Sequence, residues 1–92
     1  MFVQLEKHDV VVVRSHMPAV GEVLGQDVIV VYSEESEQFS TLWARHDGDS
    51  SKYTLMWRGN FDGCLKEFGD IVGDIFIDYL SAVNSAAREK DQ

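Results

Sequence analysis

The sequence is poor in cysteine, proline and positive charge. Its single cysteine, Cys64, cannot form an internal disulfide, and the cysteine framework that staples many small secreted domains is absent. One proline in 92 residues, with 45% hydrophobic residues and 11% aromatic residues, is typical of a folded chain and not of a disordered acidic tail. We therefore expect one globular domain over residues 1–92, with a frayed tail over residues 87–92, in the cytoplasm.

Long apolar runs are also missing. The longest uncharged apolar stretches, Val10–Val13 and Val28–Tyr32, are far shorter than the roughly 20 residues that a membrane-spanning helix needs. No basic region precedes an apolar one at the N-terminus, as a secretory signal requires. We therefore expect a protein that neither enters a membrane nor is exported.

Positive charge is scarce, because eight Lys and Arg residues stand against sixteen Asp and Glu residues, for a formal net charge of −8. Such a balance opposes direct binding to DNA, RNA or anionic lipid, and it favours fast association with basic surfaces. The expected macromolecular partner is therefore a basic protein or nucleoprotein.

The first third of the chain contains three β-rich runs. Phe2–Glu6 and Val10–Arg14 are separated by only three residues, so they form either two strands of a tight hairpin or one bent strand. Asp27–Ser33 holds four consecutive β-branched residues, which predicts a strand buried on much of both faces. Glu34–Glu37 is its expected turn.

The clearest β signal is a hairpin made of Gln38–His46 and Lys52–Arg58, joined by residues 47–51, which are rich in turn formers. Alternation with Thr41 opposite Trp57 and Trp43 opposite Leu55 places the aromatic residues of both strands on one face. In an acidic chain, core packing explains this face better than stacking on nucleic-acid bases does.

Two segments have helical spacing. Residues 18–24 begin with proline and end before Gly25, which allows a short helix. From Asn60 onward apolar residues recur every three or four positions, which predicts one helix over Phe61–Ala87 that covers the aromatic face. We interpret Gly69 and Gly73 as points where this helix closely approaches the sheet or its tryptophans.

These elements together predict an α+β fold, in which a small antiparallel sheet of four or five strands packs against one long C-terminal helix.

Motifs that carry chemistry are weak. Residues 47–51 resemble the start of a calcium loop, but Lys52 and Arg58 stand where such a loop needs glycine and a bidentate glutamate. Cys64, in the first turns of the predicted helix, is better explained as a small core residue than as a thiol nucleophile.

The histidines and the cysteine share no zinc-ligand spacing: His8, His16, His46 and Cys64. We therefore expect no enzymatic activity, no metal and no cofactor.

Carboxylates form one line on the predicted helix. At 100° per residue, Glu67, Asp70, Asp74 and Asp78 fall within an arc of about 80°, opposite the centre of the apolar arc. Like charges four residues apart cost a few tenths of a kcal/mol per pair, and Lys66 is the only base between residues 60 and 80. Carboxylates about 6 Å apart have roughly the spacing of backbone phosphates, so such a helix suits a basic nucleic-acid-binding groove.

These features predict a non-enzymatic binding protein that inhibits a partner by occupying its basic nucleic-acid-binding surface. The expected binding residues are the helix acids and the acids of the predicted turn: Glu67, Asp70, Asp74, Asp78, Glu34, Glu35 and Glu37. The chain is similar in general type to small phage-encoded inhibitors of bacterial defence, including anti-CRISPR proteins and DNA mimics, although no motif assigns it to such a family. The alternatives are a structural or assembly module that acts through a sheet edge or an apolar patch, and a small enzyme or ligand-binding domain with a concave pocket.

Overall fold

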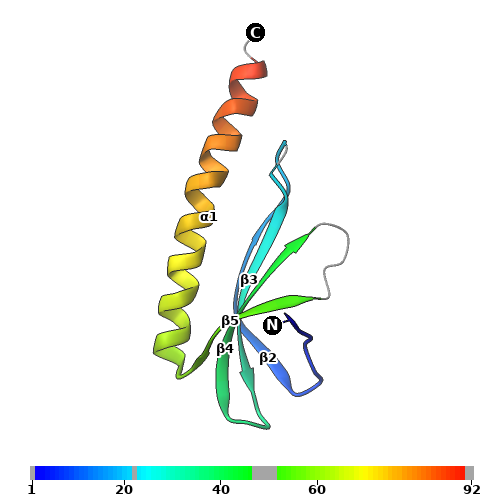
Figure 1. Cartoon of the computed structure of the whole chain (residues 1–92), viewed down its shortest axis with the longest axis vertical. Helices are drawn as coiled ribbons and strands as arrows, with labels where there is room; N and C mark the ends of the chain where they lie inside the picture. Colours follow the sequence, from blue (N-terminus) through cyan, green and yellow to red (C-terminus); the bar gives the residue numbers. More distant parts are fainter. Residues whose placement is uncertain (1, 22, 47–51, 91–92) are drawn as a thin grey trace.

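The computed structural model, which describes residues 2–21, 23–46 and 52–90, consists of a five-stranded antiparallel sheet and one long helix (Figure 1). The elements are β1 (Phe2–Val3), β2 (Asp9–Met17), β3 (Gly25–Ser33), β4 (Gln38–His46), β5 (Tyr53–Gly59) and α1 (Phe61–Lys90). The strands are ordered β1-β5-β4-β3-β2, and α1 packs on β3, β4 and β5. The predicted α+β fold is confirmed.

The first two strands do not form the predicted hairpin or a single bent strand. β1 pairs with β5, placing Val3 opposite Tyr53, whereas β2 pairs with β3 at the other edge of the sheet. Between them the chain crosses the face of the sheet that α1 leaves uncovered, and a turn closes where the Asp9 amide donates to the Glu6 carbonyl at 3.1 Å. The two runs are therefore close in sequence but belong to opposite edges.

The short helix predicted near residues 18–24 is not formed by the described residues of that segment. Val20 and Val23 instead exchange two backbone hydrogen bonds of 3.0 and 2.9 Å, which close a tight turn between β2 and β3. Gly21 has a φ of +58°, a left-handed conformation that glycine adopts without steric cost. Pairing of the flanking strands therefore overrides the helical spacing of the valines.

β3 is buried on both faces, as its β-branched run predicts. Every residue from Gly25 to Val31 is buried. Val28 packs beneath α1 in a cluster with Met17 and Ile75. Ile29 and Val31 pack on the opposite face of the sheet in a second cluster. The sheet therefore has two small cores, one on each side.

β4 and β5 form the predicted antiparallel hairpin, but their register shifts partway along. Thr41 lies opposite Trp57 as predicted, whereas the next residue of β4 already lies opposite Leu55. This β-bulge adds one residue to β5, and an added residue reverses the side to which the rest of a strand points. Tyr53 and Leu55 therefore pack in the core on the uncovered face, and the prediction that they share a face with Trp43 is wrong.

α1 is fixed to the sheet by a hydrogen bond near each end of the contact. The buried Thr41 hydroxyl donates to the carbonyl of Cys64 at 2.8 Å. The Tyr79 hydroxyl donates to the carbonyl of Pro18 at 2.6 Å, just beyond β2. Between these two bonds, Ile75 packs against the sheet, and the last turns of α1 extend past the β2–β3 hairpin (Figure 1). The helix is therefore held in one orientation on the sheet.

The sheet covers only part of the apolar arc of α1. Ile75 is 7% exposed, whereas four other large apolar side chains of the helix are between 40% and 54% exposed: Leu65, Phe76, Leu80 and Val83. We call these four residues, with Gly69 and Gly73 between them, the apolar flank. On a helical wheel the apolar flank is centred about 100° to one side of Ile75, and the predicted acid line about 100° to the other side. α1 therefore has a sheet-facing side, an acidic side and an uncovered apolar side.

Only one glycine within α1 is explained by close packing. A Cβ at Gly63 would collide with the ring of Trp57. A Cβ at Gly69 or Gly73 would meet nothing within 4 Å, so the prediction that these two glycines approach the sheet or its tryptophans is wrong. Each glycine in a helix interior costs roughly 0.5–1 kcal/mol relative to alanine. Among the described residues, no contact of the sheet requires the glycine at either position.

Gly69→Ala and Gly73→Ala are each expected to raise the free energy of unfolding by about 0.5–1 kcal/mol, because alanine restricts the unfolded chain and has room in the folded one. Urea unfolding at low micromolar protein concentration measures this effect. The matched control is Gly63→Ala, which should destabilise the protein because its methyl group must displace Trp57. Equal effects at all three positions would contradict the packing described above.

Candidate functional site

The four acids of the predicted line lie on one side of α1, about 100° around the helix from the sheet-facing Ile75. Asp70, Asp74 and Asp78 are exposed, and Glu67 is half-buried. At 1.5 Å per residue the line is about 16 Å long. Among the described residues, the ion pairs are those of Asp27 with Arg14 and His16, and they include no acid of α1. The three aspartates are therefore exposed and take part in none of these ion pairs, although Lys66 stands four residues before Asp70.

The other predicted binding acids lie in the turn between β3 and β4, and all three are exposed: Glu34, Glu35 and Glu37. This turn is at the end of the sheet where α1 begins, since Phe39 packs on Phe61 with their ring centroids 5.0 Å apart. The acid line starts six residues later, about 9 Å further along the helix axis. The structure therefore contains two acidic groups, of which only the one on α1 forms a line.

The residues considered for metal or thiol chemistry are not brought together. Cys64, in the first turns of α1, is fully buried and is a core residue, as predicted. Within the described part of the chain, no three His, Cys, Asp or Glu side chains form a group that can hold a metal ion. The loop resembling a calcium site, residues 47–51, lies outside the described residues. The described chain also contains no helix with the length and hydropathy of a membrane span.

Sequence reasoning missed a charged cluster on the uncovered face of the sheet. Asp27 is 1% exposed, and its carboxylate accepts hydrogen bonds from the Arg14 guanidinium at 3.2 Å (Nε to Oδ1) and 3.0 Å (Nη2 to Oδ2). His16 Nδ1 lies 3.3 Å from Oδ1 of the same carboxylate. Arg14 and His16 are two residues apart on β2 and so point to the same face. Two features of the sequence could have indicated this cluster. Asp27 comes directly before a β-branched run, and Arg14 and His16 alternate on the run that pairs with it.

The electrostatics of this cluster favour a structural role. The hydrogen bond from Arg14 to Asp27, and the charge of Asp27, raise the pKa of the Arg14 guanidinium. Burial raises the pKa of Tyr53, and the charge of Asp27 raises it further. Tyr53 therefore stays protonated at neutral pH, and the carboxylate is paired with the Arg14 guanidinium, which holds β2 against β3. This arrangement contains no activated nucleophile.

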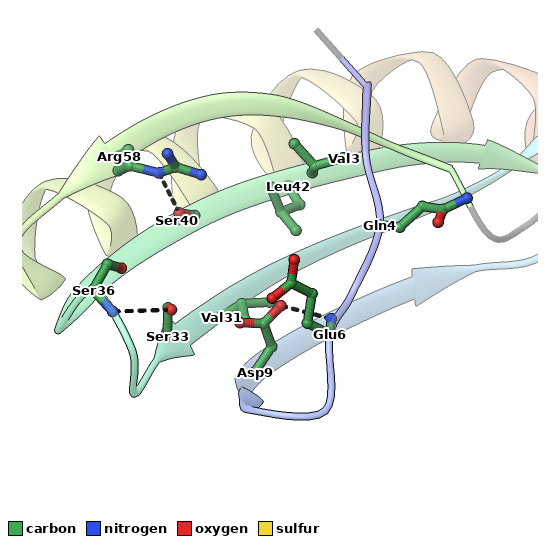
Figure 2. Close-up of a pocket in the computed structure, with 10 residues that line it drawn as sticks. All are labelled: Val3, Gln4, Glu6, Asp9, Val31, Ser33, Ser36, Ser40, Leu42 and Arg58. Carbon is green, nitrogen blue, oxygen red and sulfur yellow. Dashed lines mark hydrogen bonds between the residues drawn. The ribbon is translucent and has the colours of Figure 1, made fainter.

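A cavity of about 360 Å³ opens on the same uncovered face, between the N-terminal segment and the middle strands (Figure 2). Arg58 Nε donates to Ser40 Oγ at 3.1 Å, and the Glu6 amide donates to Asp9 Oδ2 at 2.8 Å. The size of the cavity is in the range of ligand sites, which are usually lined by apolar groups with a few converging polar ones. Here several polar groups instead bond to their own neighbours, as the dashed lines in Figure 2 show. These bonds join β5 to β4, close the turn between β3 and β4 and close the turn before β2, so they favour a structural role for the polar groups around the cavity.

Comparison with protein-family models, with curated proteins and with solved structures finds no match to this chain. Its function is therefore inferred from its own residues.

Proposed function

We propose that the protein is a non-enzymatic binding protein that inhibits a basic, nucleic-acid-handling partner by placing the acid line of α1 in its positively charged groove. The observation that carries this proposal is the exposure of Asp70, Asp74 and Asp78, none of which takes part in an ion pair of the described residues. A surface that needed helix stability alone would gain from a lysine or arginine four residues away from each acid. Lys66 stands four residues before Asp70, but neither Asp74 nor Asp78 has a lysine or arginine three or four residues away, and the three aspartates follow one another at four-residue steps.

The way α1 is held supports this use. Hydrogen bonds from Thr41 and Tyr79 fix the helix on the sheet before any partner arrives. A surface that is already ordered loses little conformational entropy on binding. A row of carboxylates about 6 Å apart can release the counterions of a basic groove as the phosphates of a nucleic acid do. The net charge of −8 adds long-range attraction that speeds the encounter.

Reversing Asp70, Asp74 and Asp78 together to lysine is expected to weaken partner binding by at least about 100-fold while leaving the fold intact, because all three side chains are exposed. The immobilised protein is incubated with cell lysate at about 50 mM and about 500 mM salt, and the proteins released between the two are identified by mass spectrometry. We expect a partner that is captured through the acid line to bind nucleic acid, to be released at the higher salt concentration and to be displaced by duplex DNA.

The matched control reverses Glu34, Glu35 and Glu37, which changes the net charge by the same amount at a different place. A much smaller loss in this control assigns binding to the helix line, whereas equal losses mean that net charge decides binding or that the turn acids, which the sequence also predicts as binding residues, contribute as much. Unchanged affinity in the α1 variant rejects the proposal.

The second candidate, an assembly module that acts through a sheet edge, is favoured by one observation on β2. This outer strand exposes between 44% and 48% of Val10, Val11 and Val12. A bulge between Val11 and Val13, however, interrupts the ladder, and bulges protect sheet edges from pairing with other chains. Binding through this edge would be insensitive to salt and to charge reversal on α1, so the experiment above also separates the two candidates.

A further inference from the structure

The apolar flank of α1 is a feature of the structure that the acid line does not use. Its four large side chains, Leu65, Phe76, Leu80 and Val83, are 40%, 54%, 54% and 41% exposed. They extend over about 27 Å of helix, and the flank contains no charged residue. Single exposed apolar residues are ordinary, but a continuous uncharged stripe along a helix marks an interaction surface.

The two glycines of the flank indicate what kind of surface fits it. Gly69 and Gly73 are four residues apart, so they lie one above the other on the same side of the helix. Both open to empty space, and the helix-propensity cost described above is not offset by a contact with the sheet. A depression between large side chains accepts a bulky side chain of a second helix and lets the two backbones approach closely. The flank therefore has both projections and depressions.

We propose that the apolar flank is a self-association surface, at which two copies of this chain pair antiparallel through α1. A two-fold axis that passes between Gly73 and Phe76 places Phe76 of each copy over Gly73 of the other. The same axis places Leu80 over Gly69. In a two-fold interface every such contact occurs twice, so one helix supplies both the projections and the depressions that the pair needs.

The charge distribution selects a second copy over a basic partner. The acid line lies on the opposite side of α1, so pairing through the flank turns both lines outward and keeps them apart. A basic partner would find no charge to bind on the flank. The footprint of a helix-to-helix contact about 27 Å long is several hundred Å² per copy, at the lower end of specific interfaces, so we expect a dissociation constant in the micromolar range.

The inference does not depend on the function proposed above, and its salt dependence has the opposite sign. Two copies that each carry a net charge of −8 repel one another, and added salt screens that repulsion. Self-association is therefore expected to tighten with salt, whereas binding of a basic groove to the acid line is expected to weaken. A dimer also leaves two acid lines free for partners.

Sedimentation equilibrium of the full chain up to about 500 µM, at about 50 and 500 mM sodium chloride, tests the proposal. The wild type is expected to dimerise, more tightly at the higher salt. Phe76→Asp is expected to weaken the dimer by about 30-fold or more. Its matched control is Ser81→Asp, which adds the same charge at an exposed position of the same helix, on the acidic side and away from the flank. Ser81→Asp is expected to retain the dimer.

Gly73→Leu provides an independent test, because it fills the depression that faces Phe76 while improving helix propensity. It should stay folded by circular dichroism and lose at least about tenfold in dimer affinity. A wild type that stays monomeric at both salt concentrations overturns the proposal. Equal effects of Phe76→Asp and Ser81→Asp also overturn it, because the surface would then lie elsewhere.

Discussion

Replacing Asp27 with alanine is expected to lower the free energy of unfolding by about 2–3 kcal/mol, a large share of the 5–15 kcal/mol that holds a typical domain together. Asp27 is 1% exposed, and its carboxylate bonds to Arg14 and His16 on the neighbouring strand. Removing one partner of a buried ion pair usually costs about 3–5 kcal/mol, because the other charge stays buried. Here the Arg14 and His16 side chains are 58% and 48% exposed and can turn to water, which reduces the cost.

Urea unfolding followed by tryptophan fluorescence measures this loss. The matched control is Asp74→Ala, which removes the same carboxyl group from an exposed position on α1 and should change stability by less than about 0.5 kcal/mol. Asp27→Asn keeps the shape of the side chain and one acceptor oxygen, and should fall between the two. If Asp27→Ala and Asp74→Ala behave alike, the buried ion pair does not hold β2 on β3.

The elements that the sequence predicts well are those with strong local patterns. The run of β-branched residues from Val28 to Val31 predicted a strand buried on both faces, and its side chains are indeed buried on both faces. The apolar period of 3.6 predicted a helix starting at Phe61, where α1 begins. In each case the neighbours in sequence supply the pattern, so no distant contact is needed to read it.

The errors arose where distant contacts decide the structure. β1 is too short to indicate its partner, and its pairing with β5 depends on a chain crossing that no local pattern specifies. The bulge beside Thr41 shifts the register by one residue, and one residue is enough to move Tyr53 and Leu55 to the other face. Asp27 acquires its partners only through the register of β2 on β3.

The acid line could be predicted from the sequence, whereas the exposure of the apolar flank could not. The angles between Glu67, Asp70, Asp74 and Asp78 are properties of the helix alone, so the line was predicted from the sequence. The apolar arc, however, is wider than the strip that the sheet covers, and periodicity does not specify how a helix is rotated on a sheet. The exposure of Phe76 and Leu80 therefore emerged only from the structure.

Because of the way α1 is rotated on the sheet, two adjacent apolar residues of the helix are expected to differ in their contribution to stability. Ile75→Ala should lower the free energy of unfolding by about 2–4 kcal/mol, because Ile75 is 7% exposed and its loss leaves a cavity against Met17 and Val28. Phe76→Ala removes a larger side chain, yet it should cost less than about 1 kcal/mol in dilute solution, because Phe76 is 54% exposed.

Urea unfolding at low micromolar concentration compares the two variants while the protein is monomeric. Raising the concentration should then stabilise the wild type by mass action and leave Phe76→Ala almost unchanged, because only the wild type gains the contacts of the apolar flank. Equal losses for the two variants in dilute solution would mean that Phe76 is covered within the monomer. The flank would then not be free to meet a second copy, and the acid line would be turned further away from the sheet.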